Sequence, residues 1–289
     1  MTGFRIMSND KPDISKYINP SPAEIPEMNQ TYNQTEVPAS SKDASFSALD
    51  SSIRYSSLTN TQKDVYNAIQ EAVSRRASFI NIEHNLMLDK DFDTVWNTFL
   101  YTDPYELTTW AFDSGTRTIN SRDQVISIKL KYRMDTETMK EYLQSTREMV
   151  KKITAEADGM SDYDKAKYFH DYLVLHSTYS TMLDDKTVHT AYGCLVNGYC
   201  VCDGYARAYK LLCDEAGIPC DLVIGGKNND NEHIWNLIRI NGEWRHVDVT
   251  YDDPDGAPEN YVCHDYFYLT TAEVSQDHII NQKLNFPMP

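Results

Sequence analysis

The sequence predicts an α+β fold, with a helix followed by short strands in its last third. Apolar side chains recur at helical spacing over residues 202–216. Short strand-like runs follow at residues 221–224, 234–240 and 243–250, and Asn241-Gly242 between the last two runs indicates a tight hairpin. A helix followed by consecutive hairpin-connected strands, without strict alternation of the two, is typical of this class.

Further elements are expected before this region. Thr59 or Asn60 can cap a helix over residues 62–76, and a second helix is expected over residues 91–100. Strict alternation over residues 124–132 predicts a strand.

Two helices then lead into the last third of the chain. A long helix is expected over residues 136–157, and Ser161 can cap another over residues 162–175. The long helix is the natural bridge between the two halves.

The chain divides into three parts by composition and pattern. Residues 1–57 are rich in Ser, Pro, Asn and Thr, so we expect a disordered or irregular segment. Residues 58–157 form an α/β region without a catalytic pattern, and residues 158–289 form the third part. Met1 to Pro20 lacks the apolar core of a signal peptide, which implies a cytoplasmic protein, or a secreted one whose export signal is absent from this sequence.

The overall charge narrows the range of partners. The net charge is -16, which argues against nucleic acid and anionic membranes. No run of about 18 apolar residues occurs, so no membrane span is expected. The acidic surface is compatible with amine-bearing or basic substrates, although such a surface more often serves only solubility. The sequence leaves the oligomeric state open.

The six cysteines all lie in the third part, at positions 194, 200, 202, 213, 220 and 263. A secreted disulfide scaffold would spread them more evenly. Cys200-Val201-Cys202 lacks a second pair at zinc spacing, so we expect no metal and no cofactor.

The predicted hairpin brings a histidine and an aspartate together. A turn centred on Asn241-Gly242 pairs Trp235 with Asp248 and puts His233 on the face that carries Asp248. Such diagonal neighbours lie about 7–8 Å apart at the backbone, and their side chains can meet. A slip of one residue would separate them, so a coincidental pairing stays open on spacing alone. His246 falls on the same face and is the rival base.

Cys202 lies where the turn at residues 197–199 gives way to the predicted helix. The N-terminus of a helix supplies positive potential and free N–H groups, which lower the pKa of a thiol and can stabilise an oxyanion. The competing interpretation, a small buried apolar residue, loses weight because a His and an Asp follow in order downstream.

Three separated motifs resemble those of bacterial transglutaminase-like domains. Residues 192–208, YGCLVNGYCVCDGYARA, resemble the cysteine motif, and His233-x-Trp235-Asn236 resembles the histidine motif. Residues 247–254, VDVTYDDP, resemble the aspartate motif, and residues 265–269 with Asp277-His278 resemble the closing segment. The resemblance covers residues 160–285.

The resemblance implies a papain-like α+β transglutaminase core over residues 158–289, in which the nucleophile helix packs on an antiparallel sheet. It implies Cys202 as nucleophile in preference to Cys200, because Gly-Tyr-Ala follows one residue after the reactive cysteine in this family. His233 would then act as base and Asp248 would orient it, which leads to a thioester acyl-enzyme.

Several neighbours are secondary candidates. The Cys202 N–H needs a second oxyanion donor, for which Tyr192 and Asn197 are candidates, and Trp235 either walls the site or packs in the core. Asp252 and Asp253 are expected first as turn formers. His170 and His176 lie six residues apart, on parts of their helix too far round from each other to bind one metal ion together. His264 is expected to be structural or exposed.

These expectations define a thiol enzyme that attacks protein or peptide amides. Peptidase-like hydrolysis is the first expectation and glutamine transglutamination or deamidation the second; removal of N-linked glycan uses the same triad. The triad does not separate these reactions, because groove shape and water access choose the acceptor. A non-catalytic surface-binding module or a structural surface protein is the alternative, and the intact Cys, His and Asp argue against the module.

Overall fold

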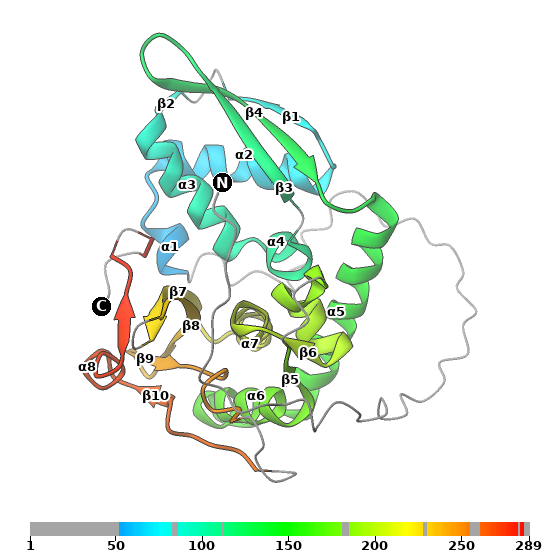
Figure 1. Ribbon diagram of the computed structural model, residues 1–289, viewed down its shortest axis with the longest axis vertical. Coiled ribbons are helices and arrows are strands. Elements are labelled where there is room, and N and C mark those ends of the chain that lie inside the picture. Colours follow the sequence, from blue (N-terminus) through cyan, green and yellow to red (C-terminus); the bar gives the residue numbers. More distant parts are fainter. Residues whose placement is uncertain are drawn as a thin grey trace.

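The computed structural model describes residues 52–82, 86–110, 112–180, 185–227, 230–254, 261–282 and 284–285. Their helices and strands form two packed regions, one above the other in Figure 1. The upper region is drawn in blue to green, and the lower region in green to red.

The first described element is α1 (Ile53–Ser56), which is fastened to the lower region. Ser52 Oγ and the Ile53 N–H each donate to the carboxylate of Asp221 at 2.6 Å, and the buried Arg54 donates to the Leu222 carbonyl at 2.9 Å. The expectation of irregular structure up to residue 57 is therefore wrong for residues 52–57, and its remainder lies outside the described residues. Long-range contacts order this stretch, and its composition gives no sign of them.

The upper region is a helix pair on a small antiparallel sheet. Helices α2 (Asn60–Ser74) and α3 (Asp89–Thr102) lie near the two predicted helices, and Thr59 forms a capping box on α2. Strand β4 (Gln124–Tyr132) matches the predicted strand. It pairs with the strands β1 (Phe79–Asn81), β2 (Met87–Leu88) and β3 (Phe112–Ile119). The region's own core holds Val65, Ile69, Phe92, Phe99, Val125 and Ile128.

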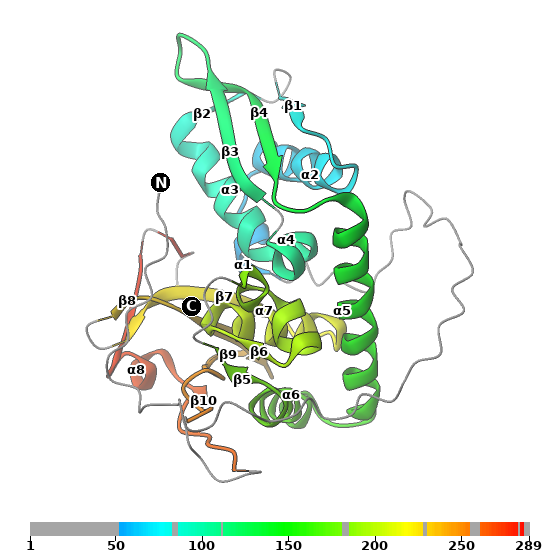
Figure 2. The same ribbon diagram turned by 45° about the vertical axis from the view of Figure 1, so that its right-hand side comes forward.

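Two helices connect the regions. Helix α4 (Pro104–Thr109) follows α3, and α5 (Thr136–Glu156) runs along one side of the molecule toward α6 (Figure 2). Val150 and Ile153 of α5 are buried in the core of the lower region. Helix α5, the predicted bridge, therefore packs into the core of the lower region.

The lower region places helices against a five-stranded antiparallel sheet of order β10-β9-β8-β7-β11. Its strands are β7 (Cys220–Lys227), β8 (Asp230–Ile240), β9 (Glu243–Val247), β10 (Phe267–Leu269) and β11 (His278–Ile280). Helix α7 (Cys202–Glu215) packs on this sheet and against α5 and α6 (Asp162–His176), which Ser161 caps as predicted. None of the described helices combines the length and apolar character that a membrane crossing needs.

The β8–β9 hairpin has the predicted register. Asn241 and Gly242 both have positive φ, 54° and 84°, and the ladder pairs Asn236 with Val247. Both turn residues of a type I′ hairpin need positive φ, which Asn and Gly tolerate. Strand β9 ends at Val247, three residues earlier than predicted, because the following residues form a turn around the carboxylate of Asp248.

Candidate active site

Cys202 is the first residue of α7 and is half-buried, whereas Cys200 is fully buried. The chain enters the helix from β6 (Tyr199–Cys200), which pairs with β5 (Thr178–Tyr179). The Val201 N–H donates to the Val188 carbonyl at 2.9 Å and fixes this entry. These exposures favour Cys202 over Cys200 as the accessible thiol.

Gly204 allows the first turn of α7 to pack closely. A Cβ at this position would lie 2.5 Å from the Cys200 Cβ and 2.6 Å from the Val188 carbonyl oxygen. Both distances are far below van der Waals contact, so only glycine fits. This packing supplies a physical reason for the glycine two residues after Cys202.

The N-terminus of α7 lacks a side-chain cap. Its N-cap residue is Val201, which offers no acceptor, whereas Thr59, Asp135 and Ser161 cap α2, α5 and α6 with side-chain oxygens. The first N–H groups of a helix have no partner within it. The backbone at Cys202 is thus arranged to receive a negatively charged oxygen.

Burial raises the pKa of the Cys202 thiol, and the charges of Asp203 and Asp248 raise it further. The peptide N–H groups of Ile234 and Asp203, which hydrogen-bond to the sulfur, lower it by less. The expectation of a lowered pKa is therefore wrong for the resting site, because the local effect of the helix terminus is outweighed by burial beside β8. The thiol needs a base to lose its proton.

His233 and Asp248 meet as the hairpin register predicts. Nε2 of His233 donates to Oδ2 of Asp248 at 2.6 Å, and both side chains are buried. The thiol of Cys202 reaches β8 at the peptide that joins His233 to Ile234. Since Nε2 is bound to Asp248, Nδ1 is the ring nitrogen left for another partner.

Asp248 is held from several sides. Its Oδ1 accepts the N–H groups of Thr250 and Tyr251 at 3.1 and 3.4 Å. Its Oδ2 also accepts Nε2 of His278 at 2.9 Å. Burial alone would raise the pKa of Asp248, but the charge and hydrogen bond of His233 and the hydrogen bond of His278 hold it below its usual range. Asp248 is thus a buried carboxylate kept ionised.

His278 lies beside Asp248, although the sequence motif places it only in the closing segment of the domain. His278 begins β11 and is buried, and its Nδ1 lies 2.6 Å from Asp277 Oδ1. Asp277 also accepts the Tyr266 hydroxyl at 2.6 Å and pairs with Lys227 Nζ at 3.2 Å. The sequence offers only the Asp277-His278 pair of the closing segment, and this motif does not indicate which side chain His278 contacts.

Trp235 packs beside His233. Its ring stacks on His233 with centroids 5.7 Å apart, and its Nε1 donates to Nδ1 of His246 at 3.0 Å. Nε2 of His246 lies 3.2 Å from the Thr271 hydroxyl, and burial lowers the pKa of His246 to about 4. Both ring nitrogens of His246, the rival base, therefore have hydrogen-bond partners. Trp235 is buried in the core and also contacts the His233 ring.

The two oxyanion candidates are engaged elsewhere. The Tyr192 ring stacks on Tyr142 of α5 with centroids 3.9 Å apart. The Asn197 amide donates to the Thr187 hydroxyl at 3.1 Å, from the end of the π-helix η5 (Gly193–Asn197). These contacts account for both side chains, and their part in an oxyanion hole stays a prediction.

Asp252 and Asp253 do more than form the turn after β9. Asp252 is fully buried, and its carboxylate accepts Nε2 of His170 and the Tyr266 N–H, each at 3.0 Å. Asp253 accepts the hydroxyl of Tyr205, in the first turn of α7. The turn that carries Asp248 is thereby tied to α6 and α7.

Two groups of side chains in the described part of the chain could hold a metal ion. One is His233, Asp248 and His278, all three of which are buried within the candidate active site. The other is His170 and Asp171 of α6 with His264, which range from buried to partly exposed.

The fold and the site define an α+β domain in which a cysteine-bearing helix meets an antiparallel hairpin with a His–Asp pair. Residues 147–249 match the family model of the transglutaminase-like superfamily, which identifies this part of the chain as a transglutaminase-like domain. The match contains Cys202, His233 and Asp248, and it begins within α5, before the boundary expected at residue 158.

Individual proteins show similarity over short spans. The kyphoscoliosis peptidases of Mus musculus and Homo sapiens are 29% identical over 98 residues, which cover 28% of this chain and 15% of each relative. A crystal structure of a TGase aligns with a TM-score of 0.37 and 15% identity, over 51% of this chain and 46% of that chain. The chain therefore matches only a small part of the curated relatives.

Proposed function

We propose that this chain is a thiol enzyme that attacks protein or peptide amides through Cys202, His233 and Asp248, with hydrolysis as its reaction. One observation carries the proposal. His233 is bonded through Nε2 to Asp248 at 2.6 Å, while the Cys202 sulfur lies at the peptide that follows His233. This leaves Nδ1 of His233 as the nitrogen that takes the thiol proton.

The residues support a two-step acyl transfer. His233 takes the proton from Cys202 as the sulfur attacks the amide carbonyl carbon, and the Cys202 N–H holds the oxyanion. His233 then gives the proton to the leaving amine, and a thioester remains. Water hydrolyses the thioester with His233 as base, whereas an amine would give transamidation. Asp248 holds the tautomer and stabilises the imidazolium.

Hydrolysis ranks first because the two curated relatives are named as peptidases. Glutamine transamidation and deamidation use the same acylation step, and a non-catalytic binding module needs none of it. The substrate of this chain does not follow from the relatives, since the match spans 15% of their length.

The test is mass spectrometry of a peptide library incubated with the protein, with and without a primary amine. Cleaved peptides are expected in both samples. Amine adducts, or a small mass change at Gln, would replace hydrolysis by transamidation or deamidation. The Cys202→Ala variant is the control, and its stability should stay near that of the wild type because the side chain is small and half-buried. Turnover by this variant would overturn the assignment of the nucleophile.

Iodoacetamide labelling tests the thiol directly. The wild type should be labelled fastest at Cys202, and His233→Ala should abolish that preference, because the thiol pKa is raised and proton removal depends on the base. Labelling of Cys202 no faster than that of half-buried Cys263 would argue for a binding module. Asp248→Asn should lower turnover less than Cys202→Ala, because the nucleophile remains; complete loss in a folded Asp248→Asn protein would contradict this ranking.

A further inference from the structure

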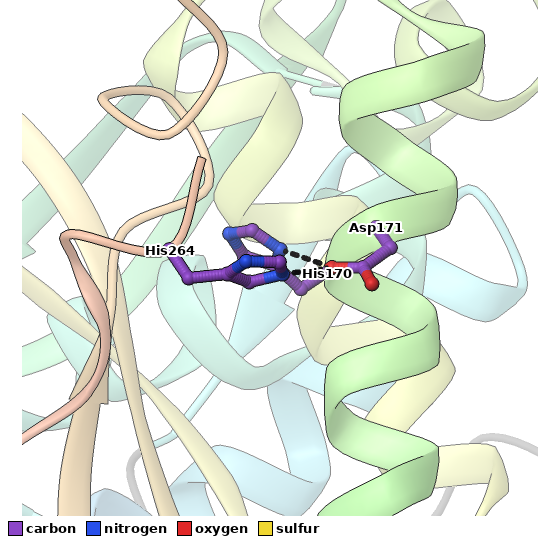
Figure 3. Close-up of side chains that lie close together, drawn as sticks. All are labelled: His170, Asp171 and His264. Carbon is purple, nitrogen blue, oxygen red and sulfur yellow. Dashed lines mark hydrogen bonds and ion pairs between the residues drawn. The ribbon is translucent and has the colours of Figure 1, made fainter. Parts of the chain in front are cut away.

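His170, Asp171 and His264 converge on one point at the edge of the lower region. His170 and Asp171 come from α6, and His264 comes from the segment that leads into β10 (Figure 3). Asp171 Oδ1 lies 3.0 Å from His170 Nδ1 and 2.7 Å from His264 Nε2. In Figure 3 the two imidazole rings lie one over the other, and both point toward the same carboxylate.

The spacing of these atoms suits a small divalent ion. A zinc-class ion bonds to imidazole nitrogen and carboxylate oxygen at about 2.0–2.2 Å, which sets neighbouring donors about 3.0–3.5 Å apart. All three donor atoms lie within 4.8 Å of one another. The observed contacts of 3.0 and 2.7 Å to Asp171 need to open by only a few tenths of an ångström. Two imidazoles and one carboxylate also form a common ligand set of open transition-metal sites.

The surroundings of His170 resemble those of a metal ligand. Its ring is fully buried, and Nε2 donates to Asp252, whose carboxylate is also buried. A ligating histidine almost always donates its other ring nitrogen to such an acceptor, which fixes the ring and leaves the first nitrogen for the metal. His264 and Asp171 are partly exposed, with 35% and 27% of their side-chain surface accessible, so an ion and its water ligands can enter.

Lys167 places a positive charge beside Asp171 and His264. Its Nζ lies 2.7 Å from Asp171 Oδ2 and 2.9 Å from His264 Nε2. The side chain is 39% exposed and can swing outward on its flexible stem. The ammonium therefore competes with a metal ion for the same two side chains.

We propose that His170, Asp171 and His264 bind one divalent transition-metal ion of the zinc class and thereby clamp the segment before β10 to α6. The clamp reaches the candidate active site through Asp252, whose N–H donates to the Asp248 carbonyl at 3.3 Å. The site departs from the expectation, made on cysteine spacing, that the chain holds no metal. It does not depend on the proposed chemistry of Cys202.

The experiment is titration of the metal-free full chain with zinc by calorimetry, and with cobalt by visible absorption. One ion per chain is expected. His264→Ala and Asp171→Asn each remove a partly exposed ligand and should weaken binding by at least about 100-fold. His176→Ala, an exposed histidine on the same helix, should bind as the wild type does. Lys167→Gln should bind about tenfold more tightly, because a competing charge is gone.

Cysteine ligation is the main competitor, since Cys263 precedes His264. Bound cobalt should lack the sulfur charge-transfer absorption of a thiolate complex, and Cys263→Ser should keep full affinity. Such a sulfur band, wild-type affinity in His264→Ala, or a wild type that takes up no zinc would each overturn the proposal.

Discussion

His246 is a buried base that the fold keeps uncharged, and its replacement should make the protein less sensitive to acid. The side chain is 1% exposed, and its Nδ1 accepts the indole N–H of Trp235 at 3.0 Å. Burial, with a further contribution from His278, lowers its pKa to about 4. A proton on Nδ1 would break the bond to Trp235, which stacks on His233.

The sign and size of the effect follow from the two pKa values. In the unfolded chain a histidine titrates near pH 6.5, so between about 6.5 and 4 the unfolded state binds more protons than the folded state. The stability that depends on neutral His246 is fully present above pH 6.5 and is lost as the pH falls toward 4. The difference of about 2.5 pKa units corresponds to about 3 kcal/mol, of which about 2 kcal/mol is lost between pH 7 and pH 5.

Urea unfolding at pH 7 and pH 5 measures this loss in the wild type and in His246→Gln. The glutamine oxygen can still accept from Trp235, and its amide can reach the Thr271 hydroxyl, but the side chain does not titrate. The free energy of unfolding of the variant should fall by about 2 kcal/mol less than that of the wild type between the two pH values. His176→Gln removes an exposed histidine and should behave as the wild type does. Other titrating groups cancel, because all three proteins share them. An unchanged pH dependence in His246→Gln would refute the reasoning.

Three further changes test other contacts. His278→Phe leaves Asp248 without one buried donor, so it should lower the free energy of unfolding by about 1.5–3 kcal/mol and reduce turnover. The effect of His278→Gln should be smaller. A fully stable and active His278→Phe protein would contradict the role of this contact. Gly204→Ala should destabilise by about 1–3 kcal/mol, because its Cβ overlaps Cys200, and a wild-type melting temperature would count against that packing. Asp221→Asn should weaken the hold on α1, so that limited proteolysis near Ser52 becomes faster; an unchanged cleavage rate would show that the two hydrogen bonds to Asp221 are dispensable.

The His–Asp pair could be predicted from the sequence because a local signal sets it. Asn241-Gly242 fixes the turn, the turn fixes the register, and a strand has a side-chain period of two. The observed pairing of Leu237 with His246 and the bond of His233 to Asp248 follow from that chain of reasoning. The helices that begin at Thr59 and Ser161 were predictable for the same reason, since a cap is a local feature.

Contacts between distant segments escaped prediction. His278 reaches Asp248 because β11 pairs with β7 and forms one edge of the sheet, a pairing that no turn residue specifies. The sequence predicts a lowered pKa for Cys202 because the helix terminus can be recognised in it, whereas the burial beside β8 that raises the pKa cannot. The order of residues 52–57 likewise depends on Asp221, which lies far along the chain.

The turn after β9 illustrates how a short acidic run can position a site. Its three aspartates bind three different elements: Asp248 binds His233 of β8, Asp252 binds His170 of α6, and Asp253 binds Tyr205 of α7. As a sequence, the run resembles an ordinary turn, because composition does not reveal which elements its carboxylates reach. Since α7 carries Cys202 and β8 carries His233, these bonds fix the cysteine and the His–Asp pair relative to each other. A displacement of α6 would therefore reach Asp248 through Asp252. The metal ion proposed for His170 would for this reason be mechanically coupled to His233, the proposed base on β8.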